Sequence, residues 1–389
     1  MTSRPTAITG YSLVNGAGAD RDAVRDALYA GRRGLSACAL ELPFEATTGS
    51  VDIALAPLEG ALAPWDTRIT RLAQHLVRAL EAELERLRAR WSKERVAVIL
   101  GTTTAGADCT EAAYKHYLEH GALPDGYDLW RHHTYGAVLY VTRTLCGAEG
   151  PSYVVSTACT ASAKPLAAAQ RLMAADLIDA AVVGGIDTLC TMTLRGFASL
   201  DALSASPCRP FSAERDGLNI GEGGALLLLE REGDPVALLE SVGESSDAYH
   251  ITAPHPKGEG AELAMRRALE LAGVAPRDVD HVNAHGTGTP LNDSAEAQAI
   301  ERLFGREVPV VSTKGYTGHT LGAAGATEAA LALITLAEGW VPPSVGAAPV
   351  DEKIAINVVT ERTSLGVRRV LSNSFAFGGN NTAVLLRAV

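Results

Sequence analysis

A cysteine, Cys159, ends an apolar run that is typical of a buried β-strand, in the segment Ser156–Ser162 (STACTAS). An Ala-rich helical segment follows, so we expect the thiol near a helix N-terminus, where free N–H groups and the helix dipole favour a thiolate. A thiolate can attack a carbonyl carbon, and an adjacent N–H can hold the oxyanion. A small buried core cysteine fits the position equally well, because free cysteine is common in cores.

A histidine, His285, also ends an apolar run, in the segment Asn283–Pro290 (NAHGTGTP). In open parallel sheets, sites collect at the carboxyl ends of strands, and the glycines here allow close backbone approach to a ligand. The alternatives to a catalytic histidine are a phosphate-cradling loop and a plain turn. The spacing matches neither a P-loop nor a dinucleotide-binding fingerprint.

A second histidine, His319, lies in the segment Ser312–Gly325 (STKGYTGHTLGAAG), also between a strand-like run and an Ala-rich helix. Lys314 precedes it by five residues. Such a lysine and histidine often lie on the protein surface without a function, but a buried lysine must be paired or lose its charge. Glu328, on the expected helix, is the partner that we predict for Lys314.

Two further segments carry polar or aromatic groups. Asp293 and Glu296 have capping-box spacing ahead of an apolar helical pattern, so we interpret them as structural. The Gly-rich segment Ser372–Asn381 holds Phe375 and Phe377. These rings belong either to the core or to a gate over an apolar pocket, with one backbone N–H directed at the site.

The string VVST occurs at Val154–Thr157 and again at Val310–Thr313. Each copy ends a β-branched run and leads through a small-residue turn into an Ala-rich helix, over Ser162–Ala175 and Leu321–Gly339. Other motif pairs recur in the same order: Val96–Gly101 with Val279–His285, and Ala225–Glu230 with Thr382–Arg387. The repeat predicts two related halves.

We place the boundary between these halves near Gly233–Pro235, with an N-terminal half over residues 1–234 and a C-terminal half over residues 235–389. Strands alternate with helical patterns in both halves. This alternation favours an α/β fold of parallel sheets covered by helices.

The composition narrows the function. Across 389 residues, 47% are hydrophobic and 20% charged, as in a folded protein. The net charge of −11 argues against a nucleic-acid partner. A local basic patch can still steer an acidic partner, and Arg68 and Arg71, with Arg78, on a segment with helical apolar spacing, are the candidates for docking such a partner. A solvated helix face is the alternative.

The six cysteines form no C-x-x-C pair and no zinc-ligand spacing, so we expect no metal and interpret them as reduced cytoplasmic thiols. The N-terminus lacks the apolar stretch of a signal peptide. We find no run of about 18 apolar residues and expect no membrane span.

Taken together, these motifs resemble the elongating β-ketoacyl-[acyl-carrier-protein] synthases, types I and II, over essentially the whole chain. The resemblance rests on five motifs in order: TACTAS around Cys159, RPFSAERDG at Arg209–Gly217, NAHGTGTP around His285, STKGYTGHTLGAAGA with Lys314 and His319, and NSFAFGGNN near the C-terminus. That family has the thiolase fold. The resemblance therefore implies two pseudo-repeated halves in a five-layered α-β-α-β-α body, usually dimeric, with no cofactor.

The resemblance also implies a reaction. Cys159 would accept an acyl chain from an acyl carrier protein as a thioester, and malonyl-carrier would then enter. His285 and His319 would hydrogen-bond the malonyl thioester carbonyl, favour decarboxylation and stabilise the enolate. Attack of this enolate on the acyl group would lengthen the chain by two carbons, in fatty-acid or polyketide biosynthesis.

Supporting roles follow from the same resemblance. The N–H groups of Cys159 and Phe377 would form the oxyanion hole, Phe377 would gate the site, and Phe375 would support it. Lys314, paired with Glu328, would support the site electrostatically. The implied partners are acyl carrier protein and an identical or ketosynthase-like second chain, in a homodimer or heterodimer.

Residue types separate the chain from its relatives. Thiolases use a second cysteine as base, initiating synthases have asparagine where this chain has His319, and silent chain-length partners lack the nucleophile. Lys164, Pro165 and the hydroxyls of Thr102–Thr104 depart from the common fatty-acid pattern. These features and the GYTGHT segment resemble ketosynthases of aryl-polyene and related secondary pathways. A non-catalytic chain-length-type partner subunit is the alternative.

Overall fold

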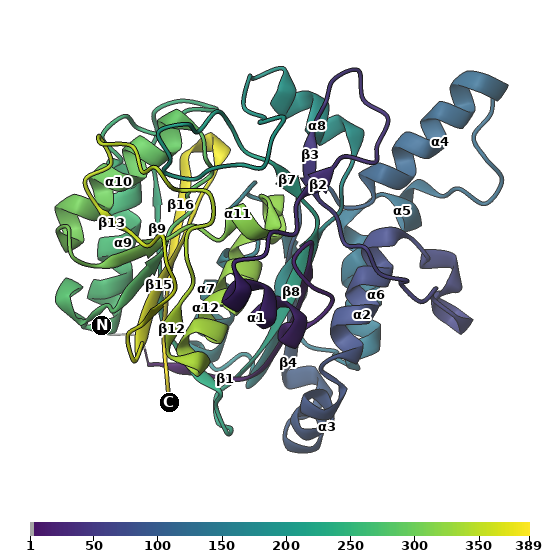
Figure 1. Ribbon diagram of the computed structural model, residues 1–389. Coiled ribbons are helices and arrows are strands. Elements are labelled where there is room, and N and C mark those ends of the chain that lie inside the picture. The colour runs from purple at the N-terminus through teal and green to yellow at the C-terminus, as the bar shows by residue number, and fades with distance from the viewer. Residues whose placement is uncertain (1–3) are drawn as a thin grey trace.

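The strands of the two halves come in the same order in the computed structural model, which describes residues 4–389 (Figure 1). In the N-terminal half the sheet order is β5-β4-β6-β8-β1, and in the C-terminal half it is β13-β11-β10-β15-β16-β9. Strands β1 and β9 pair through Thr6–Ile8 and join the halves. The topology confirms the predicted repeat. The bounds are β1 Thr6–Asn15, β4 Val96–Gly101, β5 Ser152–Val155, β6 Ala180–Asp187, β8 Gly223–Glu230, β9 Ala237–Ser246, β10 His281–Asn283, β11 Pro309–Val311, β13 Asn357–Val358, β15 Arg369–Phe375 and β16 Asn380–Arg387.

The sheets are mixed, whereas the alternation of strands and helices favoured parallel ones. The pairs β4/β5, β4/β6, β10/β11 and β10/β15 are parallel, whereas β8 and β16 each run antiparallel to both of their neighbours. A short connection at Phe377–Gly379 joins β15 to β16 as a hairpin, and such a connection can join only antiparallel strands. The period of the apolar runs does not reveal strand direction.

The helices form three layers around the two sheets (Figure 1). Helices α7 (Lys164–Ala174) and α12 (Ala324–Glu338) contact strands of both halves and lie between them. Helices α9 (Glu259–Ala272) and α10 (Pro290–Phe304) cover one outer face, and α2 (Arg68–Arg78) and α6 (Tyr135–Cys146) cover the other. This arrangement confirms the five-layered fold.

Helix α12 is buried along nearly its whole length because Ala, Leu and Ile line it on all sides. Together with the turn before it, the segment Leu321–Glu338 has mean hydropathy 1.3 over 18 residues, long and apolar enough to cross a membrane. From the sequence alone, we expected no apolar run of this length. Since 89% of it is buried inside the protein, it is the core helix between the two sheets.

The apolar helical pattern that begins at Ile69 is divided between two helices, α2 and α3 (Glu81–Arg90). Beyond them, α4 (Ala107–His120) projects from the body and is followed by the short α5 (Leu129–His132) (Figure 1). We call residues 107–140 the arm. The other elements are α1 Arg21–Ala30, α8 Thr191–Ala198, α11 Lys314–Thr317, β2 Ser36–Ala37, β3 Thr47–Gly49, β7 Ile220–Gly221, β12 Trp340–Val341, β14 Thr363–Ser364, and the 3₁₀ turns Gly60–Trp65, Lys93–Arg95, Pro276–Asp278, Leu321–Ala323 and Phe377–Gly379.

Candidate active site

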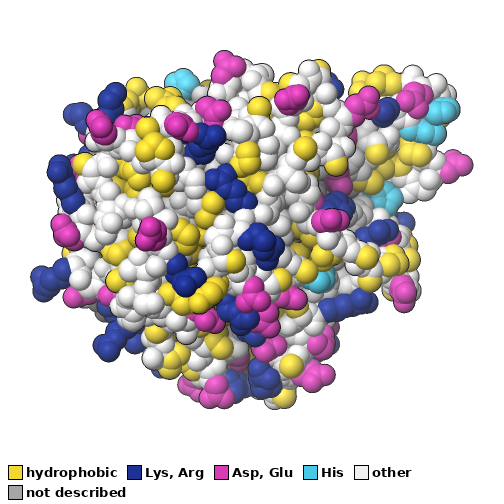
Figure 2. All heavy atoms as spheres, in the orientation of Figure 1, with side chains coloured by type: hydrophobic (Ala, Val, Ile, Leu, Met, Phe, Trp, Pro, Cys, Tyr) yellow, Lys and Arg dark blue, Asp and Glu magenta, His cyan; other side chains and the backbone are white. Residues whose placement is uncertain are grey.

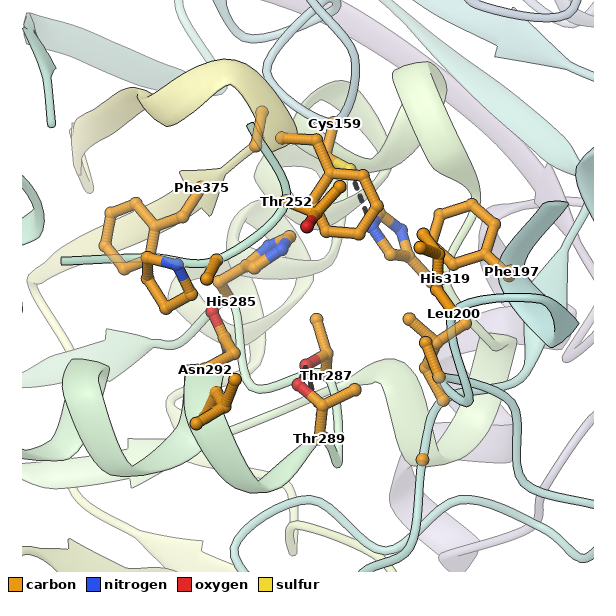
Figure 3. A pocket seen from close by; sticks show the side chains of 18 of the residues that line it. Cys159, Phe197, Leu200, Thr252, His285, Thr287, Thr289, Asn292, His319 and Phe375 are labelled. Atoms are coloured by element: carbon orange, nitrogen blue, oxygen red, sulfur yellow. Dashed lines mark hydrogen bonds between the residues drawn. The ribbon is translucent and has the colours of Figure 1, made fainter. Parts of the chain in front are cut away.

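Three reactive side chains meet where strands of the two halves end. Cys159 follows β5 of the N-terminal half. His285 follows β10, and His319 follows β11, the strand of the C-terminal half that is equivalent to β5. The Sγ atom of Cys159 lies 3.0 Å from Nε2 of His319. The two imidazole rings stand edge to face with centroids 5.2 Å apart (Figure 3). The predicted meeting of Cys159 with both histidines is therefore present in the fold.

The turn before α7 holds Cys159 in a constrained place. Ala158, just before it, has φ +50°, a region that costs a non-glycine residue free energy. Helix α7 begins only at Lys164, so the thiol lies outside the first helical turn. Burial raises the pKa of Cys159 to about 12, although the Lys314 charge opposes this. Burial of the thiol therefore opposes the thiolate that a nearby helix N-terminus favours.

Local hydrogen bonds set the tautomer of each histidine. The backbone N–H of Leu321 donates to Nδ1 of His319 over 3.2 Å, so the ring proton of a neutral imidazole resides on Nε2. The Lys314 ammonium lies 3.2 Å from Nδ1 of His285, which places that ring proton on Nε2 as well. Burial, with the Lys314 charge, lowers the pKa of both histidines well below 6.5. Two neutral N–H donors therefore serve the site.

The predicted contact between Lys314 and Glu328 is confirmed. Both side chains are buried, and the ammonium donates to a Glu328 carboxylate oxygen. It also donates to the backbone carbonyl of His285 over 2.5 Å, so all three of its protons have partners. Burial raises the pKa of Glu328 to about 7 against the opposing effect of Lys314.

Asp293 and Glu296 do not cap a helix, because α10 begins at Pro290 with Thr289 as its N-cap. Instead, Glu296 accepts the backbone N–H groups of His285 (2.8 Å) and Gly286 (2.7 Å). Asp293 accepts those of Phe211 and Gly288. Their role is structural, as predicted, but they hold the loop that carries His285 rather than the helix start.

A cavity of about 260 Å³ opens onto Cys159 and both histidines. Its apolar lining includes Phe197, Leu200, Phe375 and Phe377, and its polar lining includes Thr287, Thr289 and Asn292. Figure 3 shows these residues, Phe377 aside, around Cys159 and the two histidines. Phe377 is 37% exposed and stacks on Phe197 of α8, with ring centroids 5.5 Å apart. Phe375 is buried 5.8 Å from the His285 ring. Phe375 therefore packs against the site, and Phe377 lies at its mouth.

Arg68 and Arg71 lie together at the start of α2, each a little over one-third exposed. Arg68 donates to the buried Glu222 and to the carbonyl of Val51. Arg71 pairs with Asp66 at 2.5 Å. Both charges therefore have partners within the chain but remain partly exposed, and their role in docking an acidic carrier protein stays a prediction.

Cys159, His285 and His319 are also the one group of potential metal ligands found within residues 4–389, with ligand atoms within 4.8 Å of one another. Spacing along the chain could not reveal this group, because its members come from three separate turns. The Lys314 ammonium beside His285 disfavours a cation there.

Sequence reasoning missed Phe197 and Asp187. Phe197 lies within an ordinary amphipathic helix, which carries no signal of a pocket. Asp187 is a lone acidic residue at the end of β6, and its buried carboxylate accepts hydrogen bonds from all of Thr102–Thr104. Only the fold brings these residues together.

Comparison with known proteins defines the class. Residues 3–234 match the family model described as "Beta-ketoacyl synthase, N-terminal domain", and residues 236–348 match the corresponding C-terminal domain. The chain belongs to the β-ketoacyl synthase family and is an acyltransferase of thiolase fold. It is 33% identical over 322 residues to 3-oxoacyl-[acyl-carrier-protein] synthase 2 of Staphylococcus aureus (strain COL), covering 76% of this chain and 75% of that one.

Solved structures extend the likeness. One chain of the structure of ketosynthase ApeO in complex with its chain length factor ApeC, from Xenorhabdus doucetiae, gives a TM-score of 0.94 at 37% identity, covering 99% of this chain and 98% of that one. The ishigamide ketosynthase/chain length factor gives 0.92 at 26% identity, with both chains fully covered. A beta-ketoacyl synthase from Burkholderia phymatum STM815 gives 0.89 at 28% identity, also with both fully covered.

Proposed function

We propose that this chain condenses malonyl-carrier protein with an acyl chain held on Cys159. The observation that carries the proposal is the convergence of one thiol and two Nε2–H donors on a single cavity. Cys159, His285, His319 and Lys314 act in catalysis, and Glu328 and Phe375 support them. No step requires a cofactor.

The first step is acyl transfer to Cys159. Sγ attacks the thioester carbonyl of the acyl-carrier, a new S–C bond forms, and the bond to the carrier thiol breaks. The proton of Cys159 passes to the departing carrier sulfur. The backbone N–H groups of Cys159 and Phe377 hold the oxyanion during this transfer. The raised pKa of Cys159 favours proton loss during the attack rather than before it.

In the second step, the Nε2–H groups of His285 and His319 donate to the malonyl thioester oxygen. The bond between the α-carbon and the carboxylate breaks, and CO₂ leaves. The electron pair of that bond forms the enolate, which the two donors stabilise. Neutral imidazoles suit this task, since each offers one N–H donor in a fixed position and does not readily give up that proton to the enolate. The enolate carbon then attacks the acyl-Cys159 carbonyl, and Cys159 leaves as the free thiol after protonation.

The acyl chain that we propose belongs to a secondary pathway of the aryl-polyene kind rather than to primary fatty-acid synthesis. The GYTGHT segment around His319, with Lys164, Pro165 and the hydroxyls of Thr102–Thr104, supports this through its resemblance to ketosynthases of such pathways. Mass spectrometry of Cys159 after incubation with carriers loaded with saturated, polyenoyl and aryl chains tests it. Preferential loading of the saturated chain would contradict the pathway while leaving the reaction intact.

The partners that we propose are acyl carrier protein and a second thiolase-fold chain, in the cytoplasm. Three neighbouring structures are complexes of ketosynthases with a chain length factor or carrier protein. Here β5 is an edge strand, which can pair with another chain. Near it, the arm exposes Tyr114, Tyr117, Leu118 and Trp130 (Figure 2 shows hydrophobic side chains and histidines over it). Exposed apolar groups of this density favour an interface.

The second candidate is a non-catalytic chain-length partner. The likeness to two structures that contain a chain length factor beside a ketosynthase favours this candidate. Stoichiometric labelling of Cys159 by an acyl-carrier substrate in the isolated protein excludes it. Failure of that labelling, with a folded protein and an intact carrier, supports it.

A further inference from the structure

Asp187, a buried carboxylate at the end of β6, takes no part in the reaction steps proposed above. Its side chain is fully buried and accepts hydrogen bonds from six neutral donors. Three are the hydroxyls of Thr102, Thr103 and Thr104, at 2.6–2.8 Å. Three are backbone N–H groups, those of Thr103, Thr104 and Ala323. A set made only of donors fits an ionised, acceptor-only carboxylate.

These donors come from different segments. Thr102–Thr104 form the turn after β4, in the N-terminal half. Ala323 belongs to the C-terminal half, four residues beyond His319, and its N–H lies 3.1 Å from Asp187. Asp187 therefore ties the turn that carries His319 to the N-terminal sheet.

A second link runs through the hydroxyl of Thr103, which donates to Asp187 and accepts the N–H of Gly322 at 3.0 Å. The carbonyl of Gly322 in turn accepts the N–H of Ser162, three residues after Cys159, at 2.9 Å. The turns that carry Cys159 and His319 are thus fastened to each other and to Asp187.

The fastened turn is strained and sets a tautomer. Leu321 has φ +53°, in the region that disfavours side chains, and its N–H donates to Nδ1 of His319. Such strain persists only where surrounding contacts hold it. The neighbouring residues Gly322 and Ala323 are those bound to Thr103 and Asp187. A Cβ on Gly322 would come within 2.8 Å of the Asp187 carboxylate, so the fit is close.

We propose that Asp187, through Thr103 and the N–H groups of Gly322 and Ala323, is the positioning residue that sets the Cys159–His319 distance and the His319 tautomer. The proposal rests on the catalytic roles proposed above for Cys159 and His319. Asp187 acts through these residues and does not touch the substrate. Loss of one acceptor oxygen releases the strained turn, frees the Leu321 N–H, and lets Nδ1 compete for the ring proton.

The test compares Asp187→Asn with Glu230→Gln. Glu230 is a matched control, because it is also a buried carboxylate with neutral and charged donors, from Thr9, Trp91 and Arg90. It lies at the opposite end of the β6/β8 pair, opposite Ala180, whereas Asp187 pairs with Gly223. We expect Asp187→Asn to lower kcat by about 30- to 100-fold with KM for both carrier substrates within about 3-fold. In Asp187→Asn, the pH dependence of the rate at which iodoacetamide alkylates Cys159 should differ from that of the wild type.

A merely structural role would lower the melting temperature and leave the kcat of the folded protein and the alkylation profile unchanged. That result, or an equal kcat loss in Glu230→Gln, overturns the proposal. Thr103→Val and Thr103→Ser decide the matter if Asp187→Asn fails to fold. The valine should shift the alkylation profile in the same direction, and the serine should restore it; an unchanged valine profile overturns the proposal. Because alkylation needs no condensation, failure of the proposed function would appear separately, as condensation by Cys159→Ala.

Discussion

The Sγ atom of Cys159 and Nε2 of His319 lie 3.0 Å apart although 160 residues separate them in the chain. The two residues follow equivalent strands, β5 and β11, of two halves with the same topology. The duplication therefore builds the site, since each half contributes the turn after its matching strand. In the proposed mechanism, the side chain on one turn is the nucleophile and the side chain on the other is a hydrogen-bond donor.

We predict that His319→Gln lowers the rate of malonyl-carrier decarboxylation by about 10²–10³-fold, because one of two donors to the enolate oxygen is lost. Acylation of Cys159 should be affected less. His281→Gln is the control, as His281 is also buried and on the same segment as His285, but bonds only to the carbonyl of Pro309. Release of labelled CO₂ measures the rate, and equal losses in both variants would contradict the role of His319.

The pH dependence of Cys159 alkylation follows from its raised pKa. Burial raises the pKa to about 12, so the thiolate fraction, and with it the alkylation rate, should rise about tenfold per pH unit from pH 7 to 9.5. Peptide mass spectrometry separates Cys159 from the partly exposed Cys38 and Cys109. A plateau in the Cys159 rate below pH 8 would show a stabilised thiolate and contradict this account.

The buried pair of Lys314 and Glu328 should be costly to break. Glu328→Gln leaves the ammonium without its anion and should lower the free energy of unfolding by about 3–5 kcal/mol. Glu338→Gln, at the exposed end of the same helix, should change it by less than about 0.5 kcal/mol. Urea unfolding of both variants gives the comparison. A loss below about 1 kcal/mol for Glu328→Gln would show that the pair carries little weight.

Carrier docking is best tested at Arg71. Reversal of Arg68 would set two carboxylates together at the buried Glu222 and disturb the fold, whereas Arg71 pairs with the partly exposed Asp66. Arg71→Glu should raise KM for the acidic carrier several-fold at low salt, and the effect should shrink as salt is added. Arg306→Glu is matched, because Arg306 also pairs with an acid five residues earlier, Glu301. An unchanged KM at low salt would remove Arg71 from the docking surface.

The arm supplies the prediction about the partner. Trp130 is 66% exposed, and Trp130→Glu should weaken association with the second chain by roughly 2 kcal/mol, about 30-fold. Leu177→Glu, 55% exposed and outside the arm, is the control. Mass photometry across a dilution series gives both dissociation constants. If the two variants dissociate alike, the interface lies elsewhere.

The sequence predicted the duplication and the three side chains that meet at the candidate site, because these leave local signals. The repeated VVST strings end equivalent strands, and Cys159, His285 and His319 each stand in a small-residue turn. Strand direction leaves no such signal, so the antiparallel placement of β8 and β16 was missed.

Long-range electrostatics could not be predicted either. A cysteine near a helix start suggested a thiolate, yet burial raises the pKa of Cys159, and this burial arises only when the chain folds. Asp187 and Phe197 matter only through neighbours more than 80 residues away, such as Thr103 for the first and Phe377 for the second. The same holds for the capping-box pattern at Asp293 and Glu296, which the fold uses to hold the His285 loop.

The most direct test of the central claim is intact-protein mass spectrometry of wild type and Cys159→Ala during a single turnover with acyl-carrier and malonyl-carrier. The account predicts an acyl adduct on Cys159 of the wild type that forms first and disappears as the chain, longer by two carbons, appears on the carrier. It predicts neither adduct nor product for Cys159→Ala. Condensation by that variant at a rate near that of the wild type would contradict the account.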